Sequence, residues 1–296
     1  MDIRILRYFI AVVEEESITK ASEILHTSQP NVSRQLTELE KEVGKKLFNR
    51  GNRKISLTEE GLFLYKRSKE IVELVERTET DLNLFNEKTS GDVHIGAAET
   101  NAMRLIAHLV RVLRKIYPQI IYHFFSGSTV EVKEQLNKGL LDFGILVDPP
   151  DPQKYESIKF PVNDTWGVLM RRDSPLAKLD TIKPEDIKDK PLLCAQQMLD
   201  ANDIAQWIGE DFKKLNVVTT FNLITTPAMM VEEGVGYTFT FDKLVNTTGD
   251  CNLCFRPLEP KFETGLYLIW KKHQVFSPAA NLFLKEFKNM FSNIDK

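Results

Sequence analysis

The stretch Ser17–Arg34, SITKASEILHTSQPNVSR, decides how the front of the chain folds. Apolar residues at helical spacing mark one face of this stretch until it reaches His26-Thr27-Ser28, which interrupts the pattern. A second apolar face then follows at Val32, Leu36 and Leu39. Two short apolar faces separated by a polar turn predict two helices packed at an angle, which is a helix-turn-helix.

Small polar residues stand where both helices should begin. We expect Ser17 to cap the first helix and Thr27 or Ser28 to cap the second, while Pro30 is tolerated in a first turn. The second helix then presents short hydrogen-bonding side chains and one guanidinium at its exposed end, a chemistry that suits base edges in a DNA major groove. The outward residues are Gln29, Asn31, Ser33, Arg34 and Thr37. A solvated helical hairpin in another kind of bundle is the alternative.

The composition of the chain limits its domain number and its protein class. With 296 residues, 42% hydrophobic and 27% charged, the chain has room for two or three domains of an ordinary globular protein. The net charge of −3 gives no global signal for nucleic acid, but residues 26–58 hold seven basic residues against three acidic ones. Three cysteines make no disulfide framework, and we expect neither a signal peptide nor a membrane span. These features predict a cytoplasmic protein with no membrane role.

Two further elements surround the helix-turn-helix. Residues 3–14 carry apolar positions at helical spacing and predict a first helix that completes a three-helix core. Residues 44–58, GKKLFNRGNRKISLT, predict a small hairpin with a basic tip. Arginines at such a tip can lie along a phosphate backbone or enter a minor groove, and a solvated loop is the alternative.

A long helical pattern begins after Thr58, a candidate N-cap, and runs to about residue 88. One apolar seam follows it at spacings of four and three, at Leu64, Ser68, Ile71, Val75, Thr78, Leu82 and Phe85. A single seam with charged flanks predicts a partner helix. Because a reader of two DNA half-sites needs two-fold symmetry, we expect this partner to be a second copy of the chain.

From residue 91 onward, strands and helices alternate. Expected strands lie at 92–97, 120–125, 143–147, 166–170, 191–195, 217–222, 237–240, 253–257 and 265–270. Expected helices lie at 101–117, 129–138, 184–187, 203–215, 227–233 and 277–292. This order predicts a βαβαβ unit with a parallel sheet, followed by a second α/β lobe, with the last strand and helix returning to the first lobe.

The motifs that carry a family resemblance are Ala21, Ser28-Gln29-Pro30, Ser33-Arg34, Leu39-Glu40, Gly44, Leu47-Phe48, Arg50, Arg53 and Leu57 to Gly61 (LTEEG). Looser matches are Pro118, Gly139 with Leu141-Asp142, Glu185-Asp186 before Ile187, and Val231 with Gly234 to Gly236. The sequence closely resembles LysR-type transcriptional regulators, most densely over residues 1–65.

The resemblance implies a winged helix-turn-helix domain at 1–58 and a dimerising linker helix at 59–90. It also implies a two-lobed effector domain like periplasmic solute-binding proteins, which we divide into lobe I (91–161 and 265–296) and lobe II (162–264). The implied assembly is a homodimer that forms through the linker helix and that associates further into a homotetramer. The implied partners are double-stranded operator DNA and a small-molecule effector, with RNA polymerase as a further candidate.

The family's DNA-facing positions fall on Ser28, Gln29, Pro30, Ser33, Arg34, Arg50 and Arg53. Gln29 can bond adenine with both amide atoms and Arg34 can reach guanine or phosphate, whereas Ser28 and Ser33 suit phosphate contacts. Asn31 departs from the family's usual small residue, and this change would add a polar contact or alter site preference.

In two-lobed α/β domains, ligands sit at the carboxyl ends of parallel strands, where helix N-termini offer amide donors. The candidate effector-binding residues are Glu99, Thr100, Asn101, Ser126, Gly127, Ser128, Thr129, Val147, Gln196, Gln197, Phe239 and Thr240. The run Ser126 to Thr129 resembles an anion cradle, or its hydroxyls merely cap a helix. Because Glu99 would repel a simple carboxylate, an amine-bearing or zwitterionic effector is favoured.

Catalysis has little support in the sequence. It contains no Gly-rich phosphate loop, HExxH or GxSxG motif, and its five histidines show no ligand spacing. Cys251 and Cys254 form a lone CxxC that favours packing over a redox or metal role. We therefore expect no enzyme, cofactor or metal. The alternative function is a cytoplasmic small-molecule-binding protein whose DNA-binding head is non-functional.

Overall fold

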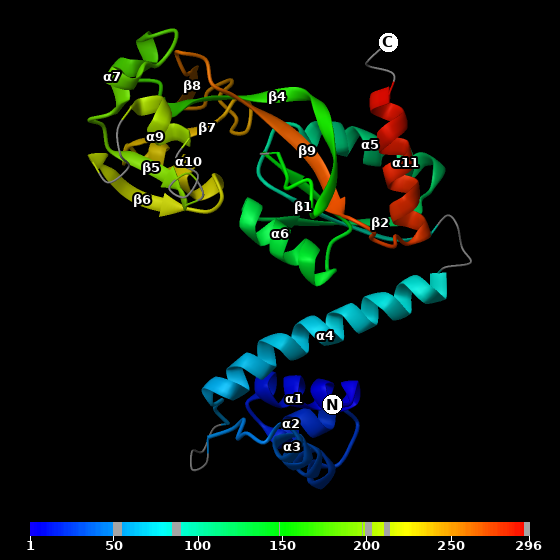
Figure 1. Cartoon of the computed structure of the whole chain (residues 1–296). Coiled ribbons are helices and arrows are strands. Elements are labelled where there is room, and N and C mark those ends of the chain that lie inside the picture. Colours follow the sequence, from blue (N-terminus) through cyan, green and yellow to red (C-terminus); the bar gives the residue numbers. More distant parts are fainter. Residues whose placement is uncertain are drawn as a thin grey trace. The chain divides into compact units, whose positions relative to one another are not determined.

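The structure is a computed structural model of the chain, and it describes residues 1–49, 55–84, 90–147, 149–196, 198, 203–209 and 214–292. The chain divides into two compact units, Met1–Asn83 and Leu84–Lys296. Figure 1 follows the chain from its helical N-terminal unit to the α/β unit. Within the described ranges, no helix has both the length and the apolar character needed to cross a membrane.

Three helices form the front of the N-terminal unit: α1 (Ile3–Glu15), α2 (Ile18–Ile24) and α3 (Gln29–Val43). They surround a core in which Phe9, Val32 and Leu39 are fully buried. The predicted helix-turn-helix is therefore confirmed, with its apolar faces turned inward. Ser17 caps α2 as predicted, since its hydroxyl accepts a hydrogen bond from the Lys20 amide at 3.3 Å.

A short hairpin follows α3. Phe48 and Leu57 form an antiparallel bridge, and the Asn49 amide donates to the Ser56 carbonyl at 3.0 Å. The predicted tip, with Arg50 and Arg53, lies outside the described residues.

Helix α4 (Glu59–Leu84) begins where predicted, because the Thr58 hydroxyl accepts a hydrogen bond from the Gly61 amide at 2.9 Å. One face of α4 turns toward α1. Tyr65 and Lys69 each place a polar atom 3.0 Å from the Glu14 carboxylate. On the same face, Ser68 is fully buried. The predicted seam is therefore wrong at Ser68, because this position already packs inside its own chain.

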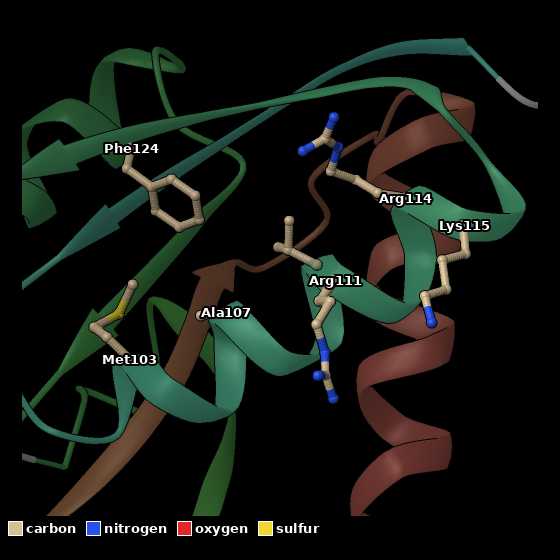
Figure 2. A pocket seen from close by; sticks show the side chains of 7 residues that line it. Met103, Ala107, Arg111, Arg114, Lys115 and Phe124 are labelled. Carbon is tan, nitrogen blue, oxygen red and sulfur yellow. The ribbon is translucent and has the colours of Figure 1, made fainter.

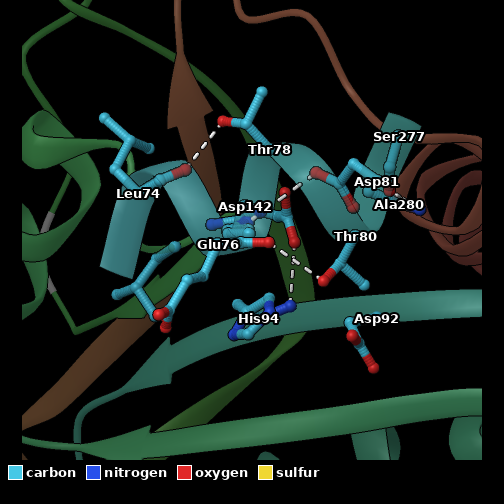
Figure 3. A network of polar contacts seen from close by, with 12 residues as sticks. Leu74, Glu76, Thr78, Thr80, Asp81, Asp92, His94, Asp142, Ser277 and Ala280 are labelled. Atoms are coloured by element: carbon cyan, nitrogen blue, oxygen red, sulfur yellow. Dashed lines mark hydrogen bonds and ion pairs between the residues drawn. The ribbon is translucent and has the colours of Figure 1, made fainter. Parts of the chain in front are cut away.

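A second face of α4 carries a stripe of exposed apolar side chains. Phe63, Ile71, Leu74 and Leu82 are 64%, 37%, 40% and 64% exposed. Thr78, on the same stripe, donates its hydroxyl to the Leu74 carbonyl at 2.7 Å (Figure 3). Because this hydroxyl is satisfied within the helix, the stripe can face an apolar partner without leaving a buried donor unpaired. We call Phe63, Ile71, Leu74 and Leu82 the α4 stripe.

The described strands of the second unit form one nine-stranded sheet in the order β2-β1-β3-β9-β4-β7-β5-β6, with β8 paired to β4. The strands are β1 (Ser90–Ala97), β2 (Gln119–Ser126), β3 (Phe143–Leu146), β4 (Tyr155–Arg171), β5 (Leu192–Ala195), β6 (Val217–Phe221), β7 (Tyr237–Phe241), β8 (Leu253–Pro257) and β9 (Glu263–Lys271). The helices are α5 (Met103–Ile116), α6 (Thr129–Lys138), the 3-10 helix η1 (Pro175–Lys178), α7 (Pro184–Ile187), α9 (Asp203–Ile208), α10 (Thr225–Glu232) and α11 (Pro278–Ser292).

In lobe I, β1 pairs in parallel with β2 and β3, so the predicted βαβαβ unit is confirmed. Strand β9 returns to this lobe antiparallel to β3, also as predicted. Helices α5 and α11 cover one face of the sheet, and α6 covers the other (Figure 1). The α6 side is so close that a Cβ on Gly144 would lie 2.8 Å from Leu136 Cδ1.

Strand β4 serves both lobes. Its residues up to Thr165 pair with β9, and from Trp166 onward they pair with β7 and β8. The expected strand at 166–170 was therefore too short, and the expected lobe boundary at 161/162 falls inside β4. Lobe II packs its own core around Val168, Leu192 and Phe239.

Candidate DNA-binding helix and effector site

The N-terminal end of α3 gathers the residues predicted to face DNA. Ser28, Gln29, Pro30, Ser33 and Arg34 are all exposed. They share this surface because the inward positions of the helix are taken by the apolar core. Ser28 holds the cap position but makes no side-chain cap bond, so the prediction of a hydroxyl cap at Ser28 is wrong.

Asn31 is half-buried and links two neighbours. Its side-chain amide donates to the Thr27 hydroxyl at 3.0 Å, and its side-chain carbonyl accepts from the Arg34 guanidinium at 3.3 Å. The Thr27 hydroxyl therefore holds Asn31, and it does not cap α3. Asn31 in turn holds the guanidinium at the exposed end of the helix, so it can orient Arg34.

The hairpin lies beside this helix. A hollow of about 360 Å³ is lined by Ser33 and Thr37 of α3 and by Lys46, Asn49 and Ile55 of the hairpin. Helix α3 and the base of the hairpin therefore share one surface.

A carboxylate from lobe I reaches lobe II. Glu99, which follows β1, accepts a hydrogen bond from the Ile224 backbone amide at 2.6 Å. Ile224 is the N-cap of α10, so Glu99 occupies the positive end of that helix. Burial raises the pKa of Glu99, and the hydrogen bond from the Ile224 amide opposes this effect. The lobes thus meet at a half-buried carboxylate.

Next to Glu99, the Thr100 hydroxyl is buried and donates to the Asp164 carboxylate on β4. The same hydroxyl accepts from the Ala102 amide at 3.0 Å. Burial raises the pKa of Asp164, while the bonds from Thr100 and the Asn101 amide lower it. Thr100 therefore fixes the β1–α5 turn against the strand that joins the lobes.

The predicted anion cradle is already filled. The Ser128 hydroxyl accepts from the Glu131 amide at 3.3 Å, and the Glu131 carboxylate accepts from the Ser128 amide at 2.7 Å. These reciprocal bonds form a capping box, the capping alternative that the sequence left open. The hydrogen bonds from Ser128 hold the pKa of Glu131 below its usual range.

The other predicted effector residues differ in exposure. Val147 is 9% exposed, Phe239 is 2% exposed and belongs to the lobe II core, and Gln196 is exposed. Thr240 is 4% exposed and its hydroxyl has no hydrogen-bond partner among the described residues. Ser126 is exposed. Thr129 is the first residue of α6, and Gly127 immediately precedes the N-cap residue Ser128. The Asn101 side chain accepts from Arg104 at 3.0 Å, and Gln197 lies outside the described residues.

Sequence reasoning missed three groups at this place: the Asp164 carboxylate, the Ile224 amide and Trp166. The ring centroids of Trp166 and Phe241 lie 4.3 Å apart, and the Trp166 indole NH donates to the Thr264 hydroxyl at 2.7 Å. The only sequence signal for Asp164 is that a polar residue stands just before an apolar strand. A backbone amide such as that of Ile224 gives no sequence signal, because every residue other than proline has one.

The cysteines fit a packing role. All three lie in described parts of the chain and none forms a disulfide. Cys251 donates its thiol to the Asn246 carbonyl at 3.2 Å, and burial raises the pKa of Cys254.

A further hollow of about 630 Å³ opens on the outer face of α5 and β2. Figure 2 shows Phe124 of β2 facing Met103 and Ala107 of α5, with three basic side chains at the other end. The basic residues are Arg111, Arg114 and Lys115.

Comparison with known proteins matches both units. The description "Bacterial regulatory helix-turn-helix protein, lysR family" covers residues 3–62, and "LysR substrate binding domain" covers residues 86–292. The HTH-type transcriptional regulator BsdA of Bacillus subtilis (strain 168) is 30% identical over 222 residues, which are 73% of this chain and 74% of BsdA. YvbU of the same organism, an uncharacterized HTH-type transcriptional regulator, is 26% identical over 98% of this chain and 99% of its own.

Among solved structures, full-length CbnR complexed with its target DNA has a TM-score of 0.76 at 19% identity, covering 98% of this chain and 99% of CbnR. This likeness shows a shared fold over the full length. Since the family match spans most of the sequence, the protein belongs to the LysR family of DNA-binding transcriptional regulators, which carry an effector-binding domain.

Proposed function

We propose that this regulator is a homodimer that binds operator DNA with its α3 helices. We also propose that a small molecule bearing a positively charged group binds between the two lobes of each chain. The observation that carries the effector proposal is the Glu99 carboxylate, which bonds the N-cap amide of α10 across the lobes. The exposed end of α3 supports the DNA proposal, as does the fold shared with CbnR, which was solved with its target DNA.

The charge expected of the effector follows from the carboxylates that already bind the N-termini of α6 and α10. An anionic ligand would seek the N-termini of α6 and α10, but Glu131 and Glu99 hold those amides. Burial raises the pKa of Glu99, which means that the protein leaves its charge incompletely compensated. An ammonium group beside Glu99 would supply that compensation. A zwitterion could also place its own carboxylate near the Thr240 hydroxyl, which has no hydrogen-bond partner among the described residues.

The effector acts by shifting an equilibrium between two arrangements of the lobes. A ligand can do this only through its different affinities for the two states. The α4 stripe offers the surface for a homodimer, and the hollow on α5 and β2 offers a second surface for a homotetramer. We further propose that the protein acts in the cytoplasm, where RNA polymerase is a candidate partner.

A thermal-shift screen of the full chain tests the effector class. Amine-bearing and zwitterionic metabolites should raise the melting temperature in proportion to occupancy, whereas simple carboxylates of similar size should not. Stabilisation by simple carboxylates alone would contradict the proposal. A gel shift on DNA upstream of the protein's own gene separates the regulator from the alternative of a small-molecule-binding protein with an inactive head.

Replacing Gln29 with alanine tests base recognition by α3. We expect Gln29→Ala to weaken operator binding by about 1–3 kcal/mol and to change binding to random DNA little, because one bidentate base contact is lost. Fluorescence anisotropy on both DNAs measures the difference.

Gln35 provides the matched control on the same helix. Its amide already donates to Glu38 at 3.2 Å, so Gln35→Ala should leave operator affinity within about twofold. Equal losses on operator and random DNA for Gln29→Ala would assign Gln29 to the phosphate backbone.

A further inference from the structure

Two histidines and one aspartate meet on the face of the lobe I sheet that also carries α6. His94 and His123 are 29 positions apart in the sequence, but they pair directly in the parallel register of β1 and β2. Asp92 precedes His94 by two residues and therefore points to the same face of β1. That face is opposite the one that packs Val93 and Ile95 into the core.

The three side chains have the spacing of a chelating set. One ligand atom from each of Asp92, His94 and His123 lies within 4.8 Å of the others. His123 Nε2 is 3.2 Å from Asp92 Oδ1. Two ligands of a tetrahedral zinc ion, each about 2.1 Å from the metal, are roughly 3.3 Å apart, so this pair already has the required separation.

Bringing the third ligand to the same ion requires one histidine ring to turn. The rings of His94 and His123 are stacked, with centroids 4.6 Å apart and planes inclined by 13°. The lone pairs of the ring nitrogens lie in the ring planes, so one of the two stacked rings must turn before both nitrogens point at one ion. His123 has room to turn because its side chain is 49% exposed. Such a rotation does not disturb the core.

The backbone under the site is held firmly. The Asp142 carboxylate, which is 2% exposed, accepts from the His94 amide at 2.8 Å (Figure 3). The Asp142 amide in turn donates to the His94 carbonyl at 2.8 Å. His94 therefore has a fixed backbone, which lowers the conformational cost of binding an ion.

We propose that Asp92, His94 and His123 form a binding site for a divalent transition-metal ion of the zinc type. Two imidazoles and one carboxylate suit zinc, nickel or cobalt, whereas calcium and magnesium prefer oxygen ligands alone. The metal replaces the contact between His123 and Asp92, and water fills the remaining coordination position. Since the ligands come from both strands, the ion ties β1, the first strand after the linker helix, to the edge strand β2.

Calorimetric titration of tag-free, full-length protein with Zn²⁺ tests this site. We expect one ion per chain at the site. His94→Gln, His123→Gln and Asp92→Asn should each weaken binding, the histidine variants by roughly tenfold or more. His108→Gln is the matched control, because His108 is an exposed histidine on α5 outside the cluster, and it should bind as the wild type does.

Two readouts separate a true site from adventitious binding. Circular dichroism and the metal-free melting temperature check that each variant folds, and His123→Gln is the safest of them because the side chain is exposed. The absorption spectrum of the Co²⁺-loaded protein should lack a thiolate charge-transfer band. No binding by the wild type, unchanged affinity in His123→Gln, or a thiolate band that identifies Cys251 as a ligand would each overturn the proposal.

Discussion

Glutamates placed together at Ile71 and Leu82 are expected to leave the regulator monomeric and to weaken operator binding by roughly a hundredfold or more. Both side chains belong to the α4 stripe and are 37% and 64% exposed in the single chain. In a dimer they would be buried against a partner helix, where two unpaired carboxylates are strongly unfavourable. A monomer must bind each half-site separately and so loses the gain from linked binding.

Light scattering and a gel shift on the operator measure the two effects. The control pair, Lys66→Glu with Asn83→Glu, adds acidic side chains at exposed positions of α4 away from the stripe. It should remain dimeric. If the Ile71 and Leu82 variant also stayed dimeric, the dimer would have to form through another surface, such as the hollow on α5 and β2.

Glu99→Gln should strongly reduce the effector's action on transcription while preserving the fold. The glutamine carbonyl can still accept the hydrogen bond from the Ile224 amide, so the lobes keep their contact. The negative charge that would hold a cationic effector is removed, and effector affinity should fall roughly tenfold or more. Effector-free operator binding should stay within about twofold. A reporter assay and effector titration by calorimetry test this, and a normal response in the variant would disprove the role of Glu99.

The pH dependence of stability gives an independent check. Because burial raises the pKa of Glu99, its ionisation opposes folding, and this cost is absent when the carboxyl is protonated. The wild type should therefore lose stability relative to Glu99→Gln as pH rises from about 4, the ordinary range of a glutamate pKa. At pH values above the raised pKa of Glu99, the difference in stability between the wild type and Glu99→Gln should be constant.

The N-terminal unit could be predicted closely because its signals are local. The apolar period around Val32 and Leu36, the Ser17 cap and the Thr58 cap each act within a few residues, and the helices begin where these signals indicate. The orientation of α4 depends on tertiary packing. Ser68 fits the heptad spacing as well as its neighbours do, and only the approach of α1 shows that it is an interior residue.

Strand β4 was underestimated because Pro161 interrupts its front half. A proline cannot donate a ladder hydrogen bond and usually argues against a strand. Here it lies at the register shift between Lys159 and Asn163, where the pairing with β9 is already irregular.

The effector-site prediction was limited by long-range contacts. The positions of the strand ends singled out Glu99 as a candidate effector-binding residue, but its observed partner is a backbone amide 125 residues away. Likewise, the five histidines look scattered in the sequence, since only the register of two parallel strands brings His94 beside His123. Ser128 lies at a helix start, and Glu131 three residues later gives the S-x-x-E spacing of a capping box, which is the sequence signal that favours a capping hydroxyl over a ligand-binding one.

The way the chain enters and leaves lobe II bears on how regulators of this kind diversify. The Trp166 amide donates to the Phe262 carbonyl at 2.9 Å, and the two rings stack with centroids 6.1 Å apart. The whole of lobe II is thus an insertion whose two ends meet at a single point of lobe I. If the effector binds between the lobes as we propose, recombination at that point would exchange one half of its site while the DNA-binding unit and the lobe I core keep their sequences. New effector specificity would then arise without a new operator.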